Sequence, residues 1–373
     1  FAILLFAFLA RGGIIGVFLT SFLSSFAHLG LFWMVLVVFG VTALAKFFAE
    51  KKFDWQNGIA VAAGLVAGWL LRPNPIGAVK IAYVQIIKLL LEKQKGTPLT
   101  FGREIFPLEW ETFFTNFLPF AVMCAAALAI FIFYLKRKKE DLSTFQKTAL
   151  WASGGLTTIF FLMTMFVARR SYDLWAVFGV AFIALIFTAF LDSKPANFKR
   201  LLNQESRITA VMAGIILFVF MFAYGVYKNG ASLAVANYPY DFRESSEWLK
   251  ANSKPGEIVV NLYWDMFPKL FFWNTQNRYI SGMDPIFQFA YDEQLYWKSY
   301  YWNTGQLTNF ACSEIECTKE MLEDTYLVLK RDFKASYIII EKKRSPTFYQ
   351  YAKEESRFRQ TFETETQAVF KVL

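Results

Sequence analysis

Two consecutive arginines, Arg169 and Arg170, lie in a short gap between two apolar runs, in the stretch "MFVARRSYDLW". A guanidinium group is permanently charged, and its planar pair of donors matches the oxygens of a phosphate. Arginines beside a membrane can instead extend their charge to the lipid headgroups from a tight turn. Asp173, one helical turn further on, would orient an arginine or act as an acid itself. The pair therefore indicates either headgroup anchoring or recognition of a lipid-linked phosphate.

Acidic residues gather just before another apolar run, where Glu104, Glu109 and Glu111 follow one another. Carboxylates at such a position could bind a divalent cation, Mg²⁺ or Mn²⁺, or take a proton from an acceptor hydroxyl. The structural alternative is that they are favourable charges at the N-terminus of a helix. Together with Asp173, Glu104 and Glu109 are the candidates for an acid or a metal ligand.

Planar polar groups mix with aromatic rings in the stretch "NLYWDMFPKLFFWNTQNRYISGMDP", which contains Asp265, Asn277, Arg278 and Asp284. Sugar rings pack their C–H faces on aromatic rings, while carboxylates and amides bind their hydroxyls. These four residues are therefore candidates for sugar binding. The alternative is that the aromatic residues form the core of a small domain.

The three cysteines carry little catalytic chemistry. Cys124 lies in an apolar run and is a small apolar residue there. Cys312 and Cys317, in "CSEIEC", are too far apart for a redox motif, and the single His28 is distant, which argues against a zinc site. We expect a local disulfide between them if this region lies outside the cytoplasm.

The elements that position these residues are mostly membrane helices, because 55% hydrophobic and 19% aromatic residues exclude a soluble globule. A helix needs roughly 20 apolar residues to cross a bilayer. Residues 1–27 would add one or two spans, giving six to eight in residues 1–229. The clear apolar runs cover about 29–45, 55–71, 113–135, 148–168, 172–191 and 208–227.

Orientation follows from the distribution of Lys and Arg. The loops 46–54, 136–147 and 192–207 are richer in these residues than the alternating segments 72–112 and 168–171. The first set is therefore predicted to be cytoplasmic, and the second set and the C-terminal domain extracytoplasmic. The formal charge of +9 lies in short loops rather than along a polar face, which favours an anionic lipid surface over nucleic acid as the partner.

The outward segment 72–112 is predicted to lie in the plane of the membrane interface. Its "RPNP" stops the preceding helix, and "IGAVKIAYVQIIKLLLEK" then has apolar residues at helical spacing with lysines opposite. Such amphipathic helices lie on a bilayer rather than across it.

Residues 230–373 predict a small extracytoplasmic α/β domain, because helix and strand patterns alternate. No Gly-rich loop opens a helix, so nucleotide binding has no support. Helices are expected at "ESSEWLKANS", "EMLEDTYLVLKRDF" and "FYQYAKEESRF", and strands at "IVVNLYW", "RYISG", "ASYIIIE" and "QAVFKVL".

The outward "RPNP" with its interface helix, the arginine pair before a late span, the many membrane helices and the C-terminal α/β domain together resemble the GT-C glycosyltransferases. The stretches "RRSYDLWAVFGVAFIAL" and "FPKLFFWNTQNRYISGMDP" are similar to uncharacterised prokaryotic members, although Gly179 stands where a proline is usual. The resemblance implies a polytopic enzyme that transfers a sugar from a polyprenyl-phosphate-linked donor to a glycan, lipid or protein acceptor on the outer face, some members with a divalent cation. Arg169 and Arg170 would then bind the lipid phosphate.

One departure concerns the catalytic acid, which the family places in the first extracytoplasmic loop. No acidic residue precedes Glu50, and the sequence opens on Phe1 inside an apolar run, so we expect an N-terminally incomplete enzyme and carry over no catalytic residue. A non-catalytic membrane protein with a glycan- or protein-binding domain is the alternative. A transporter is disfavoured, because the spans show no paired Gly/Pro-broken helices and few ionisable groups.

Overall fold

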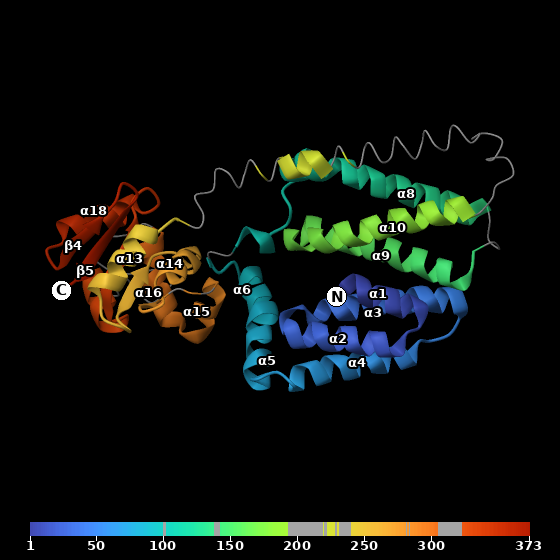
Figure 1. The fold of residues 1–373 in the computed structure, drawn as a ribbon, viewed down its shortest axis with the longest axis horizontal. Coiled ribbons are helices and arrows are strands. Elements are labelled where there is room, and N and C mark those ends of the chain that lie inside the picture. The colour runs from blue at the N-terminus through green and yellow to red at the C-terminus, as the bar shows by residue number, and fades with distance from the viewer. Residues whose placement is uncertain are drawn as a thin grey trace. The chain divides into compact units, whose positions relative to one another are not determined.

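The computed structural model describes residues 1–99, 102–137, 142–192, 219, 222–227, 230, 240–280, 282, 284–304 and 323–373. The chain forms two compact units (Figure 1). Unit 1 comprises Phe1–Lys88 and Gly102–Ala213, and unit 2 comprises Leu89–Phe101 and Gly214–Leu373. The architecture is the expected one, a helical membrane region followed by a small α/β domain. The expected boundary near residue 229 stays a prediction, because most of residues 193–239 lie outside the described part.

Among the described residues, four helical segments are long and apolar enough to cross a membrane. They confirm four of the expected spans, and their bounds are Leu29–Glu50, Trp110–Ile132, Thr144–Phe166 and Arg169–Ala189. The helices that form these segments are α3 (Phe32–Glu50), α7 (Trp110–Thr112), α8 (Leu118–Arg137), α9 (Thr144–Phe166) and α10 (Tyr172–Asp192), with the π-helical turn η4 (Phe113–Phe117) between α7 and α8. α8 and α10 extend a few residues beyond the span bounds. Of the expected span at 208–227, only residues 219 and 222–227 are described, and these are helical.

The expected span at 55–71 forms a helix that is shorter than the other candidate spans. Helix α4 (Trp55–Leu70) has 16 residues. It reaches the length of a membrane span only together with Pro75–Lys95, and the two arms are bent by 111° relative to each other. The bend has a local cause, since the side chain of Asn74 accepts a hydrogen bond from the Gly77 amide and Pro75 begins the next helix. The second arm contains α5 (Pro75–Tyr83), the π-helical turn η2 (Val84–Lys88) and α6 (Leu89–Lys95).

The first two helices, α1 (Ala2–Arg11) and α2 (Ile14–Ala27), are shorter than the roughly 20 residues that a crossing requires. α2 packs closely against α4, because Gly64 and Gly68 lie against its backbone. A Cβ atom at Gly64 would come within 2.6 Å of the Phe18 carbonyl oxygen, and one at Gly68 within 2.3 Å of the Phe22 carbonyl oxygen. Only glycine permits this approach.

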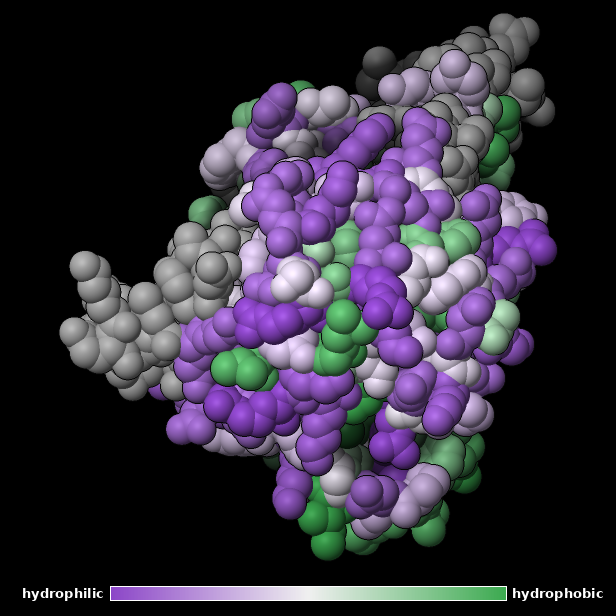
Figure 2. Space-filling view, turned by 90° about the vertical axis from the view of Figure 1, so that its left-hand side faces the viewer, coloured by the Kyte–Doolittle hydropathy of each residue, from purple (hydrophilic) through white to green (hydrophobic). Residues whose placement is uncertain are grey.

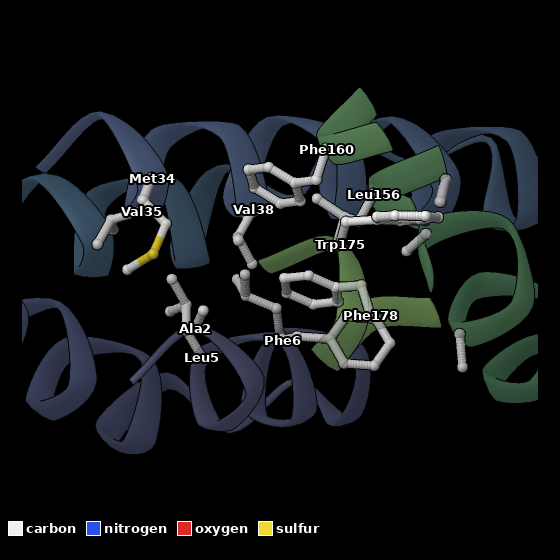
Figure 3. Packing of buried hydrophobic residues seen from close by; sticks show 14 of the residues in the cluster. Ala2, Leu5, Phe6, Met34, Val35, Val38, Leu156, Phe160, Trp175 and Phe178 are labelled. Atoms are coloured by element: carbon white, nitrogen blue, oxygen red, sulfur yellow. The ribbon is translucent and has the colours of Figure 1, made fainter. Parts of the chain in front are cut away.

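The core of unit 1 is apolar and combines aliphatic side chains with several aromatic rings (Figure 3). Phe160 of α9 stacks on Phe178 of α10 with ring centroids 5.6 Å apart, and Phe6 of α1 meets Phe178 edge to face at 5.9 Å. Helix α9 packs against both α3 and α10 and is the most buried of the candidate spans. Its start is fixed by a capping box in which Ser143 and Gln146 exchange hydrogen bonds.

Unit 2 contains a five-stranded mixed sheet in the order β2-β1-β3-β5-β4. β1 pairs in parallel with β2 and β3, whereas β5 pairs antiparallel with β3 and β4. The strands are β1 (Ile258–Asn261), β2 (Arg278–Tyr279), β3 (Ala335–Glu341), β4 (Phe358–Glu363) and β5 (Gln367–Val372). The helices are α13 (Arg243–Asn252), α14 (Phe267–Trp273), α15 (Pro285–Tyr291), α16 (Glu293–Asn303), α17 (Thr325–Leu327) and α18 (Pro346–Glu354).

Helices cover both faces of this sheet, and the alternation along β3 shows why. Ile338 and Ile340 point to a core that includes Phe348 of α18. Tyr337 and Ile339 point to the opposite core, which includes residues of α13 and α14. The four sequence-predicted strands are confirmed. β4 was missed, since the expected helix ran through Phe358, where the structure already begins a strand.

Candidate functional site

The two segments that carry the predicted charges lie side by side in unit 1. The Leu108 amide donates to the Thr164 carbonyl at 3.0 Å, so the segment before α7 runs along the end of α9. Phe113 stacks on Trp175 at 6.4 Å, and Phe117 lies 5.5 Å from Tyr172. The N-termini of α7 and α10 therefore lie at the same end of the unit.

Arg169 and Arg170 belong to a single 3-10 turn, η5 (Arg169–Ser171), between α9 and α10. The chain becomes extended at Ala168, and the Arg169 amide donates to the Phe106 carbonyl at 2.7 Å. Ser171 is buried and its amide closes the turn onto Ala168 at 3.0 Å. Hydrogen bonds to the Phe106 and Ala168 carbonyls thus fix the backbone of the turn that carries both guanidinium groups.

The two arginines have different surroundings. Arg170 Nη1 lies 2.9 Å from Glu104 Oε1, and the two side chains are 59% and 50% exposed. An ion pair this exposed contributes about 0–1 kcal/mol. Arg169 is half-buried and makes no ion pair or side-chain hydrogen bond with any residue that the structure describes. Arg169 is thus the guanidinium of the turn that has no described acid beside it.

The remaining predicted acids lie near this turn in sequence but are not joined to it. Asp173 is exposed in the first turn of α10, and Glu109 is exposed directly before α7, where its side chain caps no amide. Within the described part of the chain, neither carboxylate has an ion-pair partner. Both remain available to a ligand or to water.

A divalent cation would need several oxygen ligands at one point. Among the described residues, no group of three or more His, Cys, Asp or Glu side chains could hold a metal ion. Glu104, Glu109 and Asp173 therefore do not form such a group by themselves, and Glu104 is already paired with Arg170.

In unit 2, Asn277 has a structural position that the sequence did not indicate. It is 4% exposed, and its Nδ2 donates to Ser253 Oγ at 2.8 Å and to the Glu257 carbonyl at 3.2 Å. Its Oδ1 accepts from Asn274 Nδ2 at 2.6 Å. Both the oxygen and the nitrogen of the Asn277 side-chain amide are hydrogen-bonded, and these bonds join the end of α13 to the start of β2.

The other three predicted sugar-binding residues lie in different settings. Asp265 pairs through both oxygens with Arg344 Nη1 at 2.9 Å. Arg278 is exposed in β2, and Asp284 is half-buried directly before α15. Asp265 and Asn277 thus belong to separate hydrogen-bond networks, and the joint binding of a sugar by the four residues stays a prediction.

A polar cluster at the carboxyl ends of β1 and β3 was missed from the sequence. The Arg344 guanidinium lies 3.7 Å from the centre of the Tyr263 ring. The Tyr263 hydroxyl donates to the Arg344 carbonyl at 3.2 Å and accepts from Ser345 Oγ at 3.0 Å. The run "EKKRSP" directly after the third strand was the available signal, because open α/β sheets place ligands at the carboxyl ends of parallel strands.

The predicted disulfide between Cys312 and Cys317 lies outside the described residues, and Cys124 is a buried free thiol. No family model matches the sequence, and no curated protein matches it either. The chain is thus defined by its architecture, a helical membrane region with four to five candidate spans followed by a small mixed α/β domain.

Proposed function

We propose that this protein is a membrane glycosyltransferase of the GT-C type that transfers a sugar from a polyprenyl-phosphate-linked donor to an acceptor on the outer face of the membrane. The observation that carries the proposal is Arg169, a half-buried guanidinium without a described acid, at the N-terminal end of a membrane helix. A helix N-terminus adds positive potential to that of the side chain. The C-terminal domain would lie on the same, extracytoplasmic side.

The reaction explains why a fixed positive charge belongs there. The acceptor hydroxyl oxygen forms a bond to the anomeric carbon while the bond from that carbon to the phosphate oxygen breaks. Negative charge grows on the departing polyprenyl phosphate, so a guanidinium held in place stabilises the transition state more than the ground state. Arg169 supplies this charge, and Arg170 adds to it when the phosphate replaces Glu104 as its partner.

The proton of the acceptor hydroxyl needs a base. Asp173 and Glu109 are the candidates in this chain, because both are exposed and have no partner in the described residues. A divalent cation would neutralise phosphate charge in the same way as the arginines. The described acids do not supply a group of three ligands for one, so the proposal assigns that charge to Arg169 and Arg170.

The test uses membranes that contain the full chain, supplied with a labelled polyprenyl-phosphate hexose, and measures consumption of the donor. Arg169→Ala and Arg170→Ala should lose transfer, whereas Arg169→Lys should retain part of it because the charge remains. Arg11→Ala, at the end of α1, is the matched control for loss of an exposed arginine. Full transfer by both alanine variants would remove the phosphate role.

A second candidate function is a non-catalytic membrane protein whose α/β domain binds a glycan or a protein. The polar cluster of Tyr263, Asp265 and Arg344 favours it, since it lies at the carboxyl ends of β1 and β3. This alternative predicts that the purified full chain binds an oligosaccharide array, that Asp265→Asn weakens the binding, and that no donor is consumed.

A further inference from the structure

Unit 2 carries an exposed group of aromatic side chains that neither sheet core uses. Tyr240, Phe271 and Phe272 are 65%, 44% and 66% exposed. The Trp273 ring lies 6.3 Å from Tyr240 and 5.0 Å from Phe272. We call these four residues the aromatic patch.

The patch follows from the way α14 packs. Leu270 is fully buried in the core shared with α13, so Phe271 and Phe272, the next residues on this short helix, point away from that core. Tyr240 precedes α13 and reaches the same surface through its stack on Trp273. Exposing several large rings in one place is costly in water and marks an interaction surface.

The charges beside the patch are already neutralised. Arg243 lies over the Trp273 ring, 5.0 Å from its centre, and pairs with Glu247 at 2.9 Å. Lys269 pairs with Asp241 at 2.8 Å. The patch therefore offers rings and hydrogen-bonding edges without surplus charge. This composition fits the interfacial region of a bilayer, where Trp and Tyr are enriched, better than a polyanion.

Unit 2 is covalently linked to the candidate membrane spans of the same chain. The unit includes α6, which continues the apolar arm that starts at Pro75 and exposes Leu90 and Leu91. The segment after α6 is bound to the α/β domain, because the Tyr296 hydroxyl donates to the Pro98 carbonyl at 3.1 Å. A surface carried by a chain that is anchored in lipid meets that lipid at a high effective concentration.

A second apolar element precedes the patch. The helical residues 222–227 expose large side chains, among them Phe222 and Tyr227. Tyr240 follows Tyr227 after 13 residues, which span at most about 45 Å when extended.

We propose that the aromatic patch docks unit 2 on a lipid bilayer by inserting Phe271, Phe272 and Tyr240 into the interfacial region. The face shown in Figure 2 is mostly hydrophilic, with smaller hydrophobic areas.

The experiment measures the depth of a single spin label in the full chain, reconstituted in phosphatidylcholine bilayers. A background with Cys124→Ala, Cys312→Ser and Cys317→Ser carries Phe272→Cys, which keeps the fold because the side chain is exposed. Lys353→Cys is the matched control, since it is exposed on α18, which covers the other face of the sheet. Collisions with oxygen, which partitions into lipid, are compared with collisions with a water-soluble nickel chelate.

The label at 272 should lose collisions with the nickel chelate and gain collisions with oxygen, whereas the label at 353 should behave as in water. High salt should leave both results unchanged, because the cations beside the patch are paired. Equal exposure of both labels to the nickel chelate overturns the proposal. Protection at 272 that appears only at high protein-to-lipid ratio, or only with added oligosaccharide, also overturns it and assigns the patch to a second copy or to a glycan.

Discussion

Two arginine–carboxylate pairs, one in each unit, illustrate how differently the chain handles charge. In unit 2, Arg344 meets both oxygens of Asp265 and lies flat on Tyr263, so its charge is matched by an acid and a ring. In unit 1, Arg170 meets one oxygen of Glu104, and the adjacent Arg169 has no described acid. The first arrangement matches its positive charge within the unit, whereas the second leaves Arg169 unmatched among the described residues, as our proposed phosphate site requires.

The contrast separates Arg344, whose charge is matched by an acid within the fold, from Arg169, whose charge is not matched by any described acid. Burying part of a guanidinium without an acid beside it costs free energy instead of stabilising the fold.

Removing the uncompensated charge should have the largest effect. On the proposed function, Arg169→Ala lowers transfer by about 100- to 1,000-fold, the usual loss when one preorganised donor to a developing anion is removed. Arg344→Ala should leave transfer near the parent level. Donor consumption at saturating donor measures both variants, and equal losses in the two would abolish the contrast.

Asn277 and Arg278 should differ although they are neighbours in sequence and were both predicted to bind sugar. Asn277→Ala leaves buried partners without hydrogen bonds, which costs about 1–3 kcal/mol of the free energy of unfolding. Arg278→Ala, at an exposed position, should change it by less than about 0.5 kcal/mol. Hydrogen exchange of amides in β1 and β3 of the full chain measures both. A stable Asn277→Ala variant that loses glycan binding would restore the sugar-binding interpretation.

Unit 2 should lose stability in acid through Asp332. Hydrogen bonds from Arg331 and Lys298 lower the pKa of this carboxyl to about 2. Because the folded pKa lies below the unfolded value of about 3.9, the stabilisation is complete above pH 4 and is lost as the pH falls toward 2, a change of about 1–2 kcal/mol. Hydrogen exchange in unit 2 should accelerate over that range. Asp332→Asn should flatten this part of the pH profile, and an unchanged profile would contradict the assignment.

The smallest effect concerns the coupling energy within each ion pair, Arg344 with Asp265 and Arg170 with Glu104. Double-mutant cycles on the free energy of unfolding should give a coupling energy of about 1 kcal/mol for Arg344 with Asp265, since the stacked guanidinium is held in place. The coupling of Arg170 with Glu104 should be about 0.2–0.5 kcal/mol, because it engages only one carboxylate oxygen and its side chains are 59% and 50% exposed, against 40% and 47% for Arg344 and Asp265. A stronger coupling in unit 1 would mean that its pair is structural too.

The parts of the fold that were predicted have local signals. Four spans follow from the length of uninterrupted apolar runs, and β1 and β3 from short branched runs at turn boundaries. β4 has no such signal, because its residues are mostly polar and it exists through pairing with β5. The bend after α4 was predicted only in part. The prolines predicted that the helix stops, but not that α4 reaches the length of a membrane span only together with Pro75–Lys95.

The candidate site was harder to predict than the fold. The arginine pair stands out because charge interrupts apolar sequence. Its partner Glu104 is 66 residues away, and Arg344 is 79 residues from Asp265. No local pattern connects such residues, so only the tertiary structure distinguishes the paired arginines from Arg169.

The path of the chain through unit 2 limits how the protein can be divided. The polypeptide leaves the membrane helices at α6, contributes Leu89–Phe101 to the α/β unit, and returns to form three further candidate spans before the rest of that unit follows. A fragment that starts near residue 230 would lack the Pro98 carbonyl that receives the Tyr296 hydroxyl. Such a fragment is therefore not the whole of unit 2, which includes Leu89–Phe101. Truncation, domain exchange and fusion experiments must keep α6 with it.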